Sequence, residues 1–179
     1  FASYLASPFM LILVVLPRTM MATSILILQL AKIGTAAVTF MFFLKKISVQ
    51  KPKTISLIIF PTMYGRMPCM VVQLLDPMWL DGLIYLPLIC WGVHRLVDEG
   101  KLVPYIVPLA LMFIAHFYIG YMVGIFTFFY FCWYCLSREG RILPKKFFSR
   151  CVAFGIGTLV ALTCAAFVLI TVYNSLKLG

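Results

Sequence analysis

The segment 102–137 contains 36 consecutive residues without a single Asp, Glu, Lys or Arg. As one α-helix it would be about 54 Å long, whereas the hydrocarbon core of a bilayer is about 30 Å thick. A run of this length therefore has to turn back on itself. We expect the turn at 116–120, where His116 and Gly120 interrupt the apolar side chains. The segment thus predicts two consecutive membrane-spanning helices.

The overall composition excludes a soluble domain. Hydrophobic residues make up 64% of the 179 residues and charged residues only 11%, whereas a soluble domain is about half apolar and about a quarter charged. Mean hydropathy is +1.06. The chain is therefore predicted to be an all-α integral membrane protein, a polytopic helical bundle, with 1–179 forming a single transmembrane domain.

Apolar runs of about 20 residues predict individual spans. Six spans are expected, at 20–44, 54–75, 79–93, two within 102–137, and 151–173. A further apolar run, 1–16, is interrupted by Pro8 and predicts a juxtamembrane helix. The sequence starts at Phe1, with no charged segment before the first apolar run, so we expect no signal peptide and a fragment cut from a longer chain.

The distribution of basic residues predicts the orientation. Three alternate loops, 45–53, 94–101 and 138–150, hold 11 of the 15 Lys and Arg residues, so the positive-inside rule places them in the cytoplasm. The net charge of +10 is explained by these loops facing anionic membrane lipids. No nucleic-acid-binding motif is present, and we expect no nucleic-acid partner.

Two basic residues, Lys32 and Arg66, lie inside predicted spans, where a charge costs about 2.5–3.5 kcal/mol at the bilayer centre. One interpretation is a cationic pocket for an anionic group such as a lipid phosphate. The other is internal pairing with Asp76 or Asp81, or snorkelling toward the surface. Lys32 favours the first interpretation because its own span contains no acidic residue.

Asp81 lies at the start of the third predicted span. It is expected either to complement the helix dipole or to act, facing outward, as a general base or sugar ligand. Asp76 precedes Pro77 and is typical of a turn. His116 marks an outer turn, either as an interfacial residue or as part of a site. No ligand cluster indicates a metal, and a requirement for a divalent ion stays open.

Several segments resemble, in order, those of the bacterial YfhO family of membrane proteins. The most specific is 78–88, which reads MWLDGLIYLPL, and it is followed by GVHRL at 92–96 and HFYIGYM at 116–122. Near the start, YLASPF at 4–9 and KIG at 32–34 are also similar to this family. The resemblance covers essentially the whole chain.

The resemblance implies a fold similar to the GT-C glycosyltransferases, which use a sugar carried on a polyprenyl phosphate at the outer face of the plasma membrane. It further implies a cell-surface polymer such as lipoteichoic acid as the acceptor. By the layout of the resembled family, this fragment would lack an N-terminal span, the first outer loop and a C-terminal part, and the main catalytic acidic residue would lie on that loop, upstream of Phe1. Asp81 would orient the acceptor or the cationic residues. The substrate-binding residues expected are Lys32, Arg66, Asp76, His116 and Tyr118.

Two other functions agree with the same residues. A transporter or flippase of a lipid-linked or anionic solute would also place Lys32 and Arg66 within the membrane, although the sequence shows no convincing internal repeat. A non-catalytic partner of another membrane enzyme would tolerate substitution of Lys32 and Asp81. An acidic outer loop upstream favours the enzyme, and a duplicated set of spans favours the transporter.

Overall fold

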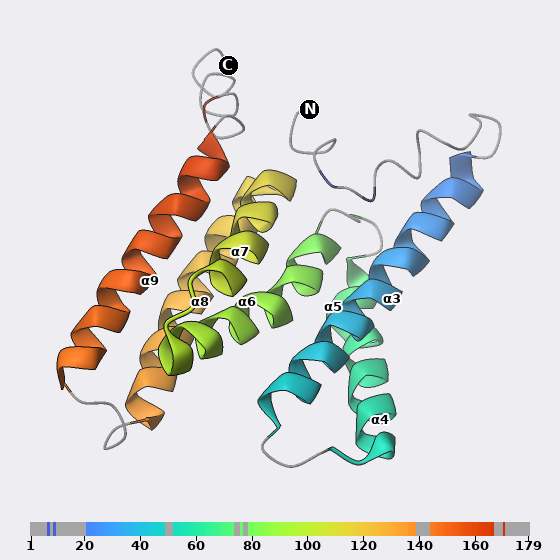
Figure 1. Cartoon of the computed structure of the whole chain (residues 1–179). Coiled ribbons are helices and arrows are strands. Elements are labelled where there is room, and N and C mark those ends of the chain that lie inside the picture. Colours follow the sequence, from blue (N-terminus) through green and yellow to red (C-terminus); the bar gives the residue numbers. More distant parts are fainter. Residues whose placement is uncertain are drawn as a thin grey trace.

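The computed structural model describes residues 7, 9, 21–48, 52–73, 76, 79–138, 144–166 and 170, which contain helices and no strand. The helices are α3 (Met21–Ile47), α4 (Thr54–Gly65), α5 (Pro68–Val72), α6 (Leu80–Glu99), α7 (Val103–Ala115), α8 (Phe117–Ser137) and α9 (Pro144–Cys164). They form one bundle of steeply inclined helices (Figure 1).

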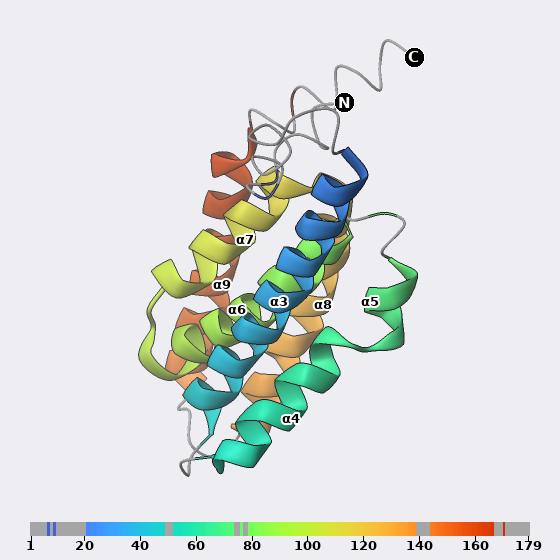
Figure 2. The same ribbon diagram turned by 90° about the vertical axis from the view of Figure 1, so that its right-hand side faces the viewer.

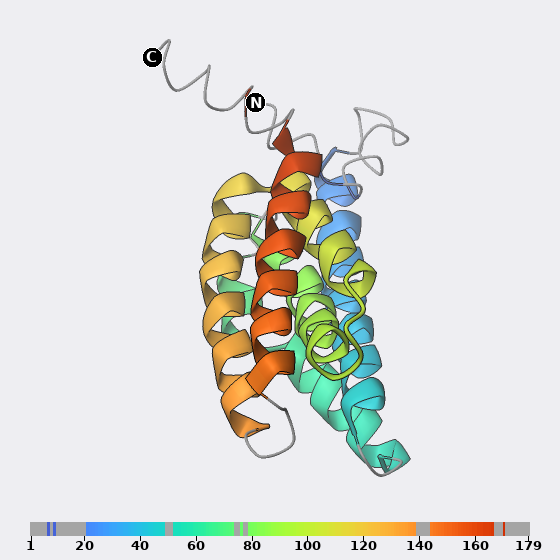
Figure 3. The ribbon, with the colours of Figure 1, turned by 60° about the vertical axis from the view of Figure 1, so that its left-hand side comes forward.

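Helix α6 lies at the centre of this bundle. It contacts α3 on one side and α7 on the other, while α4 packs on the far side of α3 and α9 on the far side of α7. The result is a row α4–α3–α6–α7–α9, with α8 packed against both α6 and α7 (Figures 2 and 3). The buried apolar side chains of α6 to α9 form the main core. Helix α6, which contains residues 80–88 of the segment 78–88, is therefore held by α3, α7 and α8.

Among the described residues, four helical stretches are long and apolar enough to cross a membrane: α3, α6, α8 and 147–164 of α9. Helices α4 and α7 are also apolar but shorter. These helices carry large apolar side chains that are exposed, for example Phe129 and Phe148. An outward apolar surface suits lipid and not water, which confirms the all-α membrane fold.

The turn predicted at 116–120 is confirmed and falls at His116, between α7 and α8. The backbone N–H of His116 donates to Met112 at 2.9 Å, which closes α7. Its Nδ1 accepts the backbone N–H of Ile119 at 3.3 Å and caps α8. A side chain at Gly120 would lie 2.7 Å from the ring of Phe113, so the glycine lets α8 pack closely on α7.

Two predicted spans need correction. The span 54–75 is broken after Gly65, where α4 ends, and α5 begins at Pro68. Proline lacks a backbone N–H and disfavours helical geometry in the residue before it, which explains the break. The helix of the last span, α9, starts at Pro144 instead of Cys151, because proline suits the first position of a helix. Its stretch that is apolar enough to cross a membrane starts at residue 147. Part of the expected loop 138–150 is therefore helical.

Helix α6 also continues beyond the predicted end of its span at residue 93. It ends at Gly100, whose φ of 76° is the left-handed conformation that favours glycine. The expected helix at 1–16 lies outside the described residues except for Ser7 and Phe9, and the end of the last expected span lies largely outside them.

Alternating helix directions bring the described parts of the basic loops together. Helix α3 ends and α4 begins at the same end of the bundle at which α8 ends and α9 begins (Figure 1). Two contacts join α6 to α8 toward this end: Asp98 pairs with Arg138 at 3.1 Å, and His94 Nε2 lies 2.7 Å from the hydroxyl of Tyr130. The opposite end carries the start of α6 and the turn at His116.

Candidate functional site

Lys32 and Asp81 form an ion pair in the interior of the bundle. Lys32 Nζ lies 2.9 Å from Asp81 Oδ1, and each side chain is only 1% exposed. The buried positions of α3 include Ser24, Leu28, Lys32 and Ala36, four residues apart, so they share one helix face. That face packs on α6 and places the lysine opposite the aspartate.

Asp81 lies in the first turn of α6, where a negative charge also complements the helix dipole. Its side chain is only 1% exposed and is buried against α3. Its second oxygen, Oδ2, is buried and has no hydrogen-bond partner among the described residues. Asp81 therefore retains an acceptor site in a place where unsatisfied polar atoms are costly.

Apolar groups surround this pair. Leu80 and Ile84, on either side of Asp81 in the sequence, form a buried cluster with Ala36 of α3 and Met70 of α5. The ring of Phe9 lies 5.6 Å from Lys32 Nζ, within the range of a cation–π contact. The low polarity around the two charges strengthens their attraction compared with that in water.

His116 lies within electrostatic range of both members of the pair. Burial lowers the pKa of this histidine in the α7–α8 turn, while Asp81 raises it and Lys32 lowers it. A neutral imidazole that accepts a hydrogen bond at Nδ1 carries its proton on Nε2. Nearby, the rings of Trp79 and Tyr118 meet edge to face at 6.1 Å. The structure thus gathers Lys32, Asp81 and His116 in one region of the bundle.

The role of Tyr64 was not predicted from the sequence. Pro87 lies inside α6 and has no N–H to donate to the carbonyl of Leu83, four residues earlier. The Tyr64 hydroxyl donates to that carbonyl at 2.8 Å, and Phe40 stacks on the Tyr64 ring at 4.4 Å. A proline within an apolar span was the available signal, because a carbonyl left free in a membrane needs another donor.

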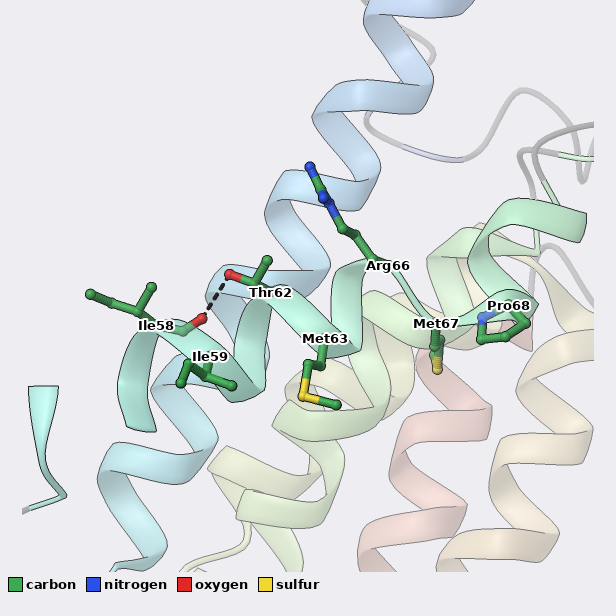
Figure 4. Close-up of a pocket in the computed structure, with 7 residues that line it drawn as sticks. All are labelled: Ile58, Ile59, Thr62, Met63, Arg66, Met67 and Pro68. Atoms are coloured by element: carbon green, nitrogen blue, oxygen red, sulfur yellow. Dashed lines mark hydrogen bonds between the residues drawn. The ribbon is translucent and has the colours of Figure 1, made fainter. Parts of the chain in front are cut away.

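Arg66 and Asp76 are not brought to the pair by any ion-pair contact among the described residues, and both are exposed. Arg66 lies in the turn between α4 and α5, beside a groove of about 550 Å³. Its walls are otherwise nearly all apolar and are formed by Ile58, Ile59, Thr62, Met63, Met67 and Pro68 (Figure 4). The internal pairing considered for Arg66 is absent from the described part of the chain.

The described residues contain no group of three His, Cys, Asp or Glu side chains close enough to hold a metal ion. Cys132 and Cys135, which are spaced like a redox or zinc motif, lie along α8 as free thiols.

Comparison with known proteins gives the family. The family model for the bacterial membrane protein YfhO matches residues 1–178. No match was found among curated proteins or solved structures. The match includes α3 with Lys32, the segment 78–88 with Asp81, and the turn at His116. The chain belongs to the YfhO family of bacterial membrane proteins.

Proposed function

We propose that the chain is part of a membrane glycosyltransferase of the GT-C type. It transfers a sugar from a polyprenyl-phosphate carrier to a hydroxyl group of a cell-surface polymer, such as lipoteichoic acid, at the outer face of the plasma membrane. Membership of the YfhO family supports this function. The observation that carries the proposal is the buried Lys32–Asp81 pair, whose aspartate lies within the segment 78–88.

The transfer needs a cation beside the leaving group. The bond between the sugar C1 and the phosphate oxygen breaks, and a bond forms between C1 and the acceptor oxygen. The electron pair of the broken bond stays on the polyprenyl phosphate, and the acceptor proton goes to a carboxylate base. We assign Lys32 to the developing phosphate charge, because a fixed cation in a site of low polarity stabilises such a charge strongly.

We assign Asp81 a positioning role. Its Oδ1 lies 2.9 Å from Lys32 Nζ and so holds the cation in place. The catalytic base would be a different carboxylate, which the family resemblance implies on an outer loop upstream of Phe1. The Oδ2 atom, which has no partner among the described residues, can accept a hydrogen bond from the acceptor hydroxyl. Because both side chains are 1% exposed, substrate reaches them only after the covering groups, Phe9 among them, move aside.

The outer mouth of the site is formed by the turn at His116 and the start of α6. In this proposal His116 donates from Nε2, and Tyr118, half of whose surface is exposed, contacts the sugar or acceptor beside Trp79. Asp76, exposed in the turn before α6, binds acceptor hydroxyl groups. The basic loops at the other end of the bundle face the cytoplasm.

The test uses bacterial membranes that contain the full-length protein, a radiolabelled polyprenyl-phosphate sugar and extracted lipoteichoic acid. Asp81→Asn is compared with Asp98→Asn, the same change at the far end of the same helix, where Asp98 pairs with Arg138 at the surface. Transfer by the wild type and Asp98→Asn, with loss in an equally abundant Asp81→Asn, supports the proposal.

Other outcomes count against parts of it. Equal transfer by all three proteins keeps the enzyme and removes Asp81 from the site. Absence of transfer by the wild type with several sugars and acceptors contradicts the glycosyltransferase, and favours a transporter, a flippase or a non-catalytic partner.

A further inference from the structure

The groove beside Arg66 lies on a helix face that no other described helix covers. Helix α4 packs on α3 through Gly65, where an added side chain would lie 3.4 Å from Ala37. The opposite side of α4 is apolar and exposed to between 49% and 67% at Ile55, Ile58, Ile59, Phe60 and Met63. In a membrane this face meets the hydrocarbon chains of lipids.

Arg66 places a charge on this apolar face. The helix break before Pro68 holds it in the α4–α5 turn, where its backbone N–H donates to Thr62 and Met63. Its side chain extends away from those of Met63 and Met67 (Figure 4), and it is exposed with no hydrogen bond or ion pair to another described side chain. A guanidinium in such surroundings is costly unless an anionic group meets it.

Among the described residues, the rest of the lining contains no competing polar donor. Thr62 is the only other described residue of the lining with a polar side chain, and its hydroxyl donates to the carbonyl of Ile58 at 2.7 Å (Figure 4). A ligand would therefore meet one cation and otherwise apolar walls. The volume of about 550 Å³ falls within the range of small-molecule sites, which is about 300–1,000 Å³.

We propose that this groove binds the polyprenyl-phosphate carrier, with its phosphate on Arg66 and its isoprenoid chain along Ile58, Ile59 and Met63. The guanidinium suits phosphate because its N–H groups form paired hydrogen bonds to two oxygens. The groove is thus a separate binding site for the carrier, in which its single phosphate contacts Arg66 and not Lys32. The choice of this lipid rests on the proposed function, whereas the complementarity to a lipid phosphate does not.

The experiment measures binding and not transfer. Full-length protein in neutral-detergent micelles is titrated with a radiolabelled long-chain polyprenyl phosphate, and with the uncharged polyprenol as a comparison. Arg66→Gln removes the charge, Arg66→Lys keeps it, and Met63→Trp fills the groove. Lys53→Gln is the matched control, because it removes a cation at the opposite end of α4. Equal elution on size exclusion checks that each variant is folded.

We expect Arg66→Gln to weaken binding of the phosphate by at least about tenfold and to leave polyprenol binding unchanged. Met63→Trp weakens binding of both lipids, and Lys53→Gln equals wild type. Arg66→Lys keeps the charge but loses the paired hydrogen bonds, so its affinity for the phosphate lies between those of Arg66→Gln and wild type. Unchanged binding in Arg66→Gln overturns the proposal. The proposal is also overturned if phosphatidylglycerol displaces the probe as effectively as unlabelled polyprenyl phosphate does, because the groove would then be a general anionic-lipid site.

The two proposals fail differently. Arg66-dependent binding without any sugar transfer contradicts the glycosyltransferase and keeps the lipid-phosphate site. Transfer by the wild type with full carrier binding in Arg66→Gln keeps the enzyme and removes Arg66 from carrier binding.

Discussion

Replacing one member of the Lys32–Asp81 pair strands a buried charge. At a separation of 2.9 Å and an effective dielectric constant of about 20, the attraction between the two charges is about 6 kcal/mol. Most of it is offset by the cost of removing both ions from water, which is several kcal/mol for each. The intact pair therefore contributes little net stability, although either ion alone is strongly destabilising.

A double-mutant cycle at Lys32 and Asp81 should therefore show non-additive losses of stability. Lys32→Met and Asp81→Leu each lower the free energy of unfolding by about 3–5 kcal/mol. The double variant loses much less than the sum, because two apolar side chains then fill the space without a charge. We expect a coupling free energy of at least about 3 kcal/mol between the two positions.

The assay is equilibrium unfolding of the full-length protein in mixed micelles by titration with sodium dodecyl sulfate, followed by circular dichroism. A matched cycle at Asp98 and Arg138, whose pair is exposed to solvent, should give a coupling of at most about 1 kcal/mol. Single variants at Lys32 and Asp81 that each lose less than about 1 kcal/mol of unfolding free energy, with effects that add, would refute the stabilising coupling of the buried pair.

Three further predictions use the same unfolding titration. Tyr64→Phe should cost about 1–3 kcal/mol, because it strands the carbonyl that Pro87 leaves free; in a Pro87→Ala background the cost should largely disappear. Gly100→Ala should cost about 1–2 kcal/mol, because the φ of 76° strains a residue with a side chain; an unchanged midpoint would contradict this. Burial lowers the pKa of His116 below its usual value near 6.5, so the unfolded chain binds the proton more readily. The stabilisation is complete above that value and is lost as pH falls through the lowered pKa; His116→Asn, a cap that does not titrate, should remove this part of the pH dependence.

Helix breaks and caps that depend on one or two neighbouring residues could be predicted from the sequence. The uncharged segment 102–137 required a turn, and His116 supplies it because its side chain can cap the next helix. Pro68 also indicates a break, because proline cannot continue the backbone hydrogen bonds of a span. The prediction of a single span at 54–75 is wrong for this reason. The start of α9 at Pro144 follows from the same property of proline.

The partners of buried polar groups could not be predicted from neighbouring residues in the sequence. Lys32 has no acidic residue in its own span, and its partner Asp81 comes from α6, far along the chain. Which face of α3 meets which face of α6 depends on packing between helices. The same holds for Tyr64 and Leu83, which are 19 residues apart. Arg66, conversely, is placed by the helix break after Gly65. Which face of α4 stays uncovered, and with it the groove beside Arg66, depends on which face of α4 packs on α3.

The role of Lys32 is the central claim of the proposed mechanism, and a single-turnover transfer rate at saturating donor tests it most directly. The full-length wild type is compared with Lys32→Met at equal abundance, with carrier binding measured in parallel. We predict that the rate falls at least about a hundredfold, as for loss of a group that stabilises charge in the transition state, while carrier binding through the Arg66 groove persists. An unchanged rate in folded Lys32→Met would contradict the account.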